Sequence, residues 1–309
     1  MDILFFTGKG GVGKSTLAAA TGWQLAQTHR VHIVSLDPAH NLGDIFGVTL
    51  KKKTAFTRQL ILEEIDLKKR TQAYLKQEIG TLNETYKYLQ VLNLDKYFSV
   101  LQYSPGIEEY ALLSGIEEII KSDTRSDYLI FDTPPTGLTL RFLALPRITI
   151  TWIDRLIQIR RTILEKCHTI HRLCGDLSQE ETLLNYDEED DRVLQRLFAL
   201  HRNYHDLDQL LQGERCRISV VFNPDLLSLR ETERLIRALG DLNLPLSLLI
   251  DNKITEANQA VADRVEERLR ELTDTSQKRV LLANGGSSGQ ERKLYEIDEN
   301  LVSWFSATP

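Results

Sequence analysis

Residues 6–16, which read FTGKGGVGKST, decide the fold of this 309-residue chain. They follow a short apolar run at 3–6 and lead into an alanine-rich helical pattern that begins at Leu17. Glycine lacks a Cβ and adopts positive φ readily, so a loop this rich in glycine can turn backbone N–H groups inward around a phosphate. A strand, a loop and a helix in this order, with this spacing, predict a phosphate-binding loop of the Walker A type.

The end of this loop carries side chains suited to a nucleoside triphosphate. Lys14 is expected to reach the β- and γ-phosphates, Ser15 to ligate Mg²⁺ through its hydroxyl, and Thr16 to hydrogen-bond the α-phosphate. ATP and Mg²⁺ are therefore the expected cofactors. The predicted nucleotide-binding residues of the loop are Gly8, Lys9, Gly10, Gly11, Val12, Gly13, Lys14, Ser15 and Thr16.

The composition narrows the class of protein. Hydrophobic residues make up 42% and charged residues 27%, as in soluble globular proteins. A net charge of −6 argues against a dedicated nucleic-acid binder, because counterion release needs a basic face. No apolar run approaches the roughly 18 residues of a membrane-spanning helix. Three cysteines without a disulfide pattern, and a start without a signal peptide, favour a cytoplasmic location.

Apolar runs of strand length alternate with helical patterns along most of the chain. This alternation predicts an α/β fold with a doubly wound, mostly parallel sheet of about eight strands, as in P-loop NTPases. Ligands bind at the carboxyl edge of such sheets, which is where the loop at 6–16 follows the first strand. The expected strands are 3–6, 31–36, 60–65, 99–103, 128–131, 218–222, 246–250 and 280–283.

From residue 148 to 212 the sheet pattern stops and apolar positions recur at helical spacing. We therefore expect a P-loop ATPase domain at 1–147 and 213–309 with a helical subdomain inserted at 148–212. The apolar stripes of that subdomain fit either core packing or contact with a second copy. Two cysteines on its first helix, Cys167 and Cys174, are about 10.5 Å apart along a straight helix, too far to share one metal ion. A site shared by His171, one cysteine and a second copy stays open.

A carboxylate ends the expected strand at 128–131. Asp132 follows this apolar run directly, which is the Walker B arrangement, in which the carboxylate holds Mg²⁺ through water. Two further acids, Asp37 and Asp44, lie seven residues apart after the second expected strand. Asp44 also fits the N-cap of a short helix.

Together these motifs resemble one family of ATPases. KGGVGK at 9–14 resembles the deviant Walker A loop of dimerising ATPases, while DPAHNLGD at 37–44 and DTPPTGLTLR at 132–141 resemble switch segments of the arsenite-efflux and tail-anchored-protein-targeting ATPase family. The resemblance implies that Asp44 orients the attacking water and that Asp37, with Ser15 and Asp132, belongs to the Mg²⁺ site. It also implies that Lys9 reaches the phosphates held by a facing subunit.

The resemblance continues after residue 213. NPDLLSLRETER at 223–234 places Asp225 at an acidic position that contacts the partner's nucleotide in the family, and Asn252 matches the asparagine that reads adenine. The residues alone also predict a capping box, with Ser228 as the N-cap and Glu231 three residues later. Asn252 equally fits a turn. We also expect a terminal helix at 297–305.

The resemblance implies a Mg²⁺-dependent ATPase that works as a nucleotide-switched homodimer, with Asp44, Lys9 and Lys14 as catalytic residues. Its helical subdomain would bind hydrophobic transmembrane segments of client proteins. One alternative is the energising subunit of an arsenite or anion efflux pump, which would need soft thiolates. Another is a switch of the MinD or ParA type, which would need a basic face or a membrane helix. The expected partners are a second copy, client segments, or a membrane receptor or pump.

Overall fold

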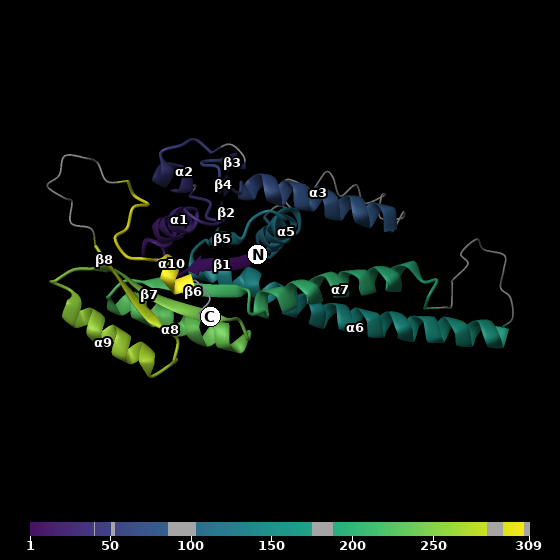
Figure 1. Ribbon diagram of the computed structural model, residues 1–309. Helices are drawn as coiled ribbons and strands as arrows, with labels where there is room; N and C mark the ends of the chain where they lie inside the picture. The colour runs from purple at the N-terminus through teal and green to yellow at the C-terminus, as the bar shows by residue number, and fades with distance from the viewer. Residues whose placement is uncertain (40, 51–52, 86–102, 175–187, 283–292, 306–309) are drawn as a thin grey trace.

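The computed structural model describes residues 1–39, 41–50, 53–85, 103–174, 188–282 and 293–305, with the side chains of 81–85 and 170–174 left out (Figure 1). Of the expected strands, the one at 99–103 lies outside these residues except for Tyr103, which is in a turn.

An eight-stranded sheet forms the centre of the molecule, in the order β3-β4-β2-β5-β1-β6-β7-β8. Within the described chain, all pairings are parallel except that of β3 with β4. The doubly wound, mostly parallel α/β fold is thus confirmed. Sequence reasoning missed β3, because two residues carry no readable alternation. The strands are β1 (Asp2–Thr7), β2 (Val31–Ser35), β3 (Thr54–Ala55), β4 (Leu60–Glu64), β5 (Tyr128–Asp132), β6 (Cys216–Phe222), β7 (Leu246–Ile254) and β8 (Gln277–Leu281).

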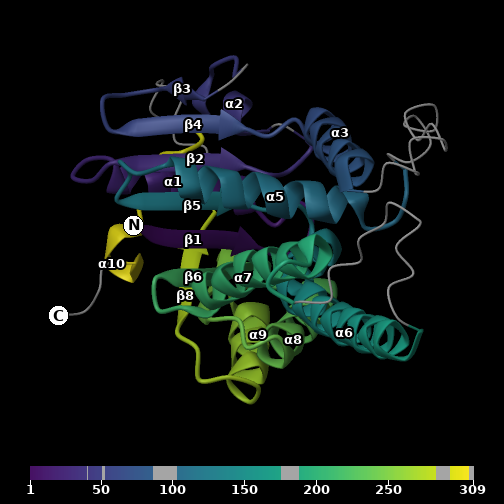
Figure 2. The ribbon, with the colours of Figure 1, turned by 90° about the vertical axis from the view of Figure 1, so that its right-hand side faces the viewer.

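Helices cover both faces of the sheet, so the central strands are buried on both sides (Figures 1 and 2). In β1, Ile3 and Phe5 face one core with α5 to α9, and Leu4 and Phe6 face the other with α1, α2 and α10. The helices are α1 (Lys14–Leu25), α2 (Asn41–Phe46), α3 (Leu67–Thr85), α5 (Ile107–Ser122), α6 (Thr136–Cys174), α7 (Arg192–Gln212), α8 (Leu226–Asp241), α9 (Gln259–Arg270) and α10 (Val302–Phe305).

Helices α6 and α7 form a hairpin that extends past the sheet (Figure 1). At 39 residues α6 is about 58 Å long, and a small core of Ile153, Ile157, Leu164 and Leu194 joins it to α7. The helix runs without interruption through residue 147, where a domain boundary is expected from the sequence. The predicted boundary therefore falls inside one continuous helix, and the division into two domains stays a prediction.

The chain end differs from expectation. The terminal helix predicted at 297–305 is wrong in extent, since α10 comprises only four residues, Val302–Phe305. Its Phe305 packs against Phe6 of β1, with ring centroids 5.7 Å apart. Tertiary packing rather than helical propensity thus holds this segment. Among the described residues, no helix has the length and apolar character needed to cross a bilayer.

Candidate nucleotide site

The glycine-rich loop lies between β1 and α1, at the carboxyl edge of the sheet. Gly13 forms the N-cap of α1 with φ 102°, a backbone conformation that residues with a side chain rarely adopt. A Cβ on Gly8 would lie 2.0 Å from the backbone oxygen of Val221, so β6 also requires glycine there. The loop is thus shaped by close backbone approach, and it leads into a helix N-terminus as an anion site does.

Lys14 is buried at the start of α1, and its Nζ donates a hydrogen bond to the carbonyl oxygen of Lys9 at 3.2 Å. Burial lowers the pKa of the Lys14 ammonium, and the charges of Asp132, Asp37 and Glu231 oppose that shift. The predicted residues Lys14, Asp132 and Asp37 therefore gather at one place. The side chain of Lys9 is half-buried, and its action on a partner's nucleotide stays a prediction.

Asp132 ends β5 and is fully buried. Its Oδ2 accepts a hydrogen bond from the hydroxyl of Ser35 at 3.3 Å, and its Oδ1 has no hydrogen-bond partner within the described chain. Burial raises the pKa of Asp132 to about 6, although hydrogen bonding from Ser15 and the charge of Lys14 favour the ionised form. A buried carboxylate oxygen without a partner, beside a serine hydroxyl, fits the oxygen-rich surroundings of Mg²⁺.

The two acids after β2 lie in different surroundings. Asp37 is half-buried, and its Oδ1 accepts a hydrogen bond from the backbone N–H of Ala39 at 3.0 Å. It is close enough to Asp132 to raise that residue's pKa. Asp44 is exposed on α2 as the fourth residue of that helix, so the alternative of an N-cap is wrong. The role of Asp44 in orienting the attacking water stays a prediction.

The start of α8 corrects the predicted capping box. Asp225, not Ser228, is the N-cap, and its side chain accepts a hydrogen bond from the Ser228 N–H at 2.8 Å. Ser228 instead accepts one from the Asn223 N–H, and the Glu231 carboxylate accepts one from the Thr136 hydroxyl. The helix begins three residues earlier than expected because an aspartate caps as well as a serine. The nucleotide contact of Asp225 stays a prediction.

Two side chains at the end of β7 reach the loop across the sheet. The Asn252 amide nitrogen donates to the carbonyl of Val12 at 2.8 Å, and Lys253 Nζ donates to the carbonyl of Gly11 at 2.7 Å. A Cβ on Gly13 would lie 2.4 Å from that amide nitrogen, so glycine makes room for Asn252. Sequence reasoning named Asn252 for adenine and missed Lys253, whose only local signal is its place at the end of a strand.

Similarity to known proteins agrees with this geometry. The sequence profile of the family described as "Anion-transporting ATPase" matches residues 1–280. The chain belongs to this family. ATP hydrolysis is therefore its activity, and a nucleotide its ligand.

Three relatives show how similar this family member is to other proteins. It is 28% identical over 260 residues to "Putative arsenical pump-driving ATPase 2" of Aquifex aeolicus, covering 84% of this chain and 82% of the relative. It is 30% identical over 259 residues to "ATPase get3" of Aspergillus terreus, covering 81% and 72%. With "Putative arsenical pump-driving ATPase 1" of Aquifex aeolicus it shares 28% over 270 residues, covering 82% of this chain but 63% of the relative.

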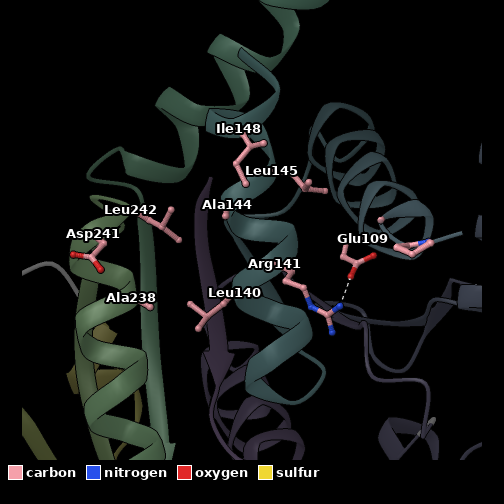
Figure 3. Close-up of a pocket in the computed structure, with 11 residues that line it drawn as sticks. Glu109, Leu140, Arg141, Ala144, Leu145, Ile148, Ala238, Asp241 and Leu242 are labelled. Atoms are coloured by element: carbon pink, nitrogen blue, oxygen red, sulfur yellow. Dashed lines mark ion pairs between the residues drawn. The ribbon is translucent and has the colours of Figure 1, made fainter. Parts of the chain in front are cut away.

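This ATPase also has an apolar cavity of about 590 Å³ where α5, α6 and α8 meet (Figure 3). An ion pair between Glu109 and Arg141, 2.9 Å long, lies at its side. The lining includes Leu140, Ala144, Leu145, Ile148, Ala238 and Leu242.

From Ile148, which lines the cavity, α6 carries a row of large apolar side chains that are exposed. Each residue of an α-helix is rotated by about 100° around the helix axis, so these side chains fall within an arc of about 80°. The residues that pack on α7 lie on another side of the helix. We call the exposed row the α6 stripe. It consists of Ile148, Trp152, Leu156, Ile159 and Ile163, and Trp152 is 66% exposed.

Proposed function

We propose that this chain is a Mg²⁺-dependent ATPase that works as a homodimer and binds hydrophobic membrane-protein segments on the α6 stripe. The observation that carries the proposal is the continuity of α6. The helix begins at Thr136, four residues after Asp132, and extends to the stripe. Trp152 is 16 residues further along, about 24 Å at 1.5 Å per residue. One continuous helix, with Pro146 inside it, therefore joins the nucleotide site to an exposed apolar surface.

The residues at the sheet edge suit phosphoryl transfer. The N–H groups of the loop and the Lys14 ammonium would hold the phosphates, and Asp44 would orient the attacking water. Ser15, Asp132 and Asp37 would hold Mg²⁺, which when bound neutralises charge on the phosphates. Lys9 would add charge to the nucleotide of a facing subunit.

The link from this site to α6 consists of hydrogen bonds in the segment after β5. The Thr133 hydroxyl donates to the carbonyl of Phe6 at 2.9 Å, and the Thr139 hydroxyl donates to that of Pro134 at 2.7 Å. Thr136 binds Glu231 of α8, whose charge acts on Lys14. Nucleotide-dependent movement of this segment would therefore move the start of α6 and change how much of the stripe is exposed.

An exposed apolar stripe supports a hydrophobic partner, because contiguous apolar patches mark interaction sites. The pump-driving alternative is the second candidate, and the names of the two Aquifex aeolicus relatives agree with it. A pump-driving ATPase that binds a metalloid would need soft thiolate ligands. Cys216 is buried, which raises its thiol pKa to about 12, and the described residues hold no group of three or more potential metal ligands. We therefore favour the first candidate.

Steady-state ATP hydrolysis tests the proposal, measured with and without a solubilised single-span membrane peptide and, in parallel, with arsenite. We expect the peptide to change turnover in the wild type and to have no effect on the double variant Trp152→Ser/Leu156→Ser. Glu165→Ser, an exposed change on α6 away from the stripe, is the matched control and should respond as the wild type does. A response to arsenite alone would instead support the pump-driving candidate.

A further inference from the structure

We propose that Lys253, together with Asn252, is a positioning residue for the phosphate-binding loop. The two side chains fix the carbonyls of Gly11 and Val12, and so aim the N–H groups of Val12 and Gly13 at the phosphates of the bound nucleotide. This inference rests on the proposed nucleotide site and deepens it. It assigns a role to a residue that neither the loop motif nor the composition indicates.

Lys253 and Asn252 each hydrogen-bond one carbonyl of the loop. Lys253 Nζ lies 2.7 Å from the Gly11 oxygen, and the Asn252 amide nitrogen lies 2.8 Å from the Val12 oxygen, across about 240 residues of sequence. Asn252 is buried. The donor of Lys253 is an ammonium group, whose hydrogen bonds are stronger than those of neutral groups. Two consecutive carbonyls of the loop are thus held from the same strand.

The directions of the loop N–H groups follow from peptide geometry. In a trans peptide the C=O of one residue and the N–H of the next point in opposite directions. Because Lys253 holds the Gly11 oxygen on one side, the Val12 N–H points to the other, and the same holds for the Gly13 N–H opposite the Val12 oxygen. Inward N–H groups are what a phosphate-binding loop requires. The two contacts therefore select the binding-competent orientation of two peptides.

The backbone of Lys253 itself has an unusual conformation. Its φ is 61°, and it is one of two non-glycine residues with positive φ in the described part of the chain. The pairing of β7 with β8 is irregular between Asp251 and Ile254, as at a β-bulge, which re-aims side chains. The Asn258 amide donates to the Lys253 carbonyl at 3.0 Å and holds the bend. Strained backbone of this kind persists where the surrounding structure enforces it, often at functional sites.

The test is nucleotide affinity of Lys253→Met, which keeps the length of the side chain and removes the donor. We expect the dissociation constants of ATP and of inorganic tripolyphosphate to rise by the same factor, about tenfold or more, as for loss of a charged hydrogen bond. A role in reading the base would weaken ATP alone. Lys278→Met on the neighbouring β8 removes an equal charge and should bind both ligands as the wild type does.

Two further variants separate positioning from stability. Lys253→Arg retains a charged donor and should recover most of the affinity, whereas Lys253→Gly relieves the positive φ and should melt no lower than the wild type while still binding weakly. Wild-type affinity in Lys253→Met, or a loss confined to its melting temperature, would overturn the inference. If the wild type itself bound no nucleotide, the proposed function would fail first, so the two failures are distinguishable.

Discussion

Replacing Asp251 by asparagine should remove a pH dependence from the stability of the folded chain. Asp251 lies on β7 and is 1% exposed, and neither of its carboxylate oxygens has a hydrogen-bond partner among the described residues. Burial raises its pKa to about 8, and the nearby charges of Glu266 and Asp225 act in the same direction. Arg279 opposes them, but its guanidinium is bound to Glu266 at 2.9 Å and to Asp263.

The sign of the effect follows from proton uptake. In the unfolded chain the carboxyl titrates near its ordinary value of 3.8, whereas in the folded protein it titrates at about 8. Between these values the folded state holds a proton that the unfolded state has released, so the free energy of unfolding falls as pH rises. At about 1.4 kcal/mol per pH unit for one proton, the loss between pH 5 and pH 7 is about 2.5 kcal/mol.

Urea unfolding followed by tryptophan fluorescence measures this loss. The difference in unfolding free energy between Asp251→Asn and the wild type should grow in favour of the variant by about 2.5 kcal/mol from pH 5 to pH 7. Other titrating groups, Asp132 included, are common to both proteins and cancel. Asp274→Asn, an exposed change between α9 and β8, should follow the wild type at every pH. Parallel stability curves for Asp251→Asn and the wild type would refute the reasoning.

Two other predictions concern the nucleotide site. Asp44→Asn should still bind a fluorescent ATP analogue and lose phosphate release, because the water-orienting group is gone while the loop is intact; normal turnover would contradict the assignment of Asp44. Gly13→Ala places a Cβ 2.4 Å from the Asn252 amide at a φ of 102°, so we expect a loss of about 1–3 kcal/mol in stability and weaker ATP binding. Thermal melting and nucleotide titration of this variant check both effects, and unchanged values would show that the loop can relax.

Sequence alone predicted the features that depend on local pattern. The glycine-rich loop, the alternation of apolar runs and the strand-ending Asp132 are each encoded within a dozen residues, and the family match over residues 1–280 agrees with them. The predicted N-cap of α8 was wrong because two nearby residues, Asp225 and Ser228, both suit that position. Only the backbone of α8 decides between them, in favour of Asp225.

Tertiary structure decided what depends on which segments become neighbours. Lys253 reaches Gly11 because β6 and β7 follow β1 in the sheet order. No periodicity in either segment predicts this contact. The apolar residues of α6 recur at one helical spacing, yet Ile153 packs on α7 while Trp152 is exposed. The sequence determined that the helix has apolar faces, and only packing decided which of them is left exposed, because burial is a property of the assembled layers.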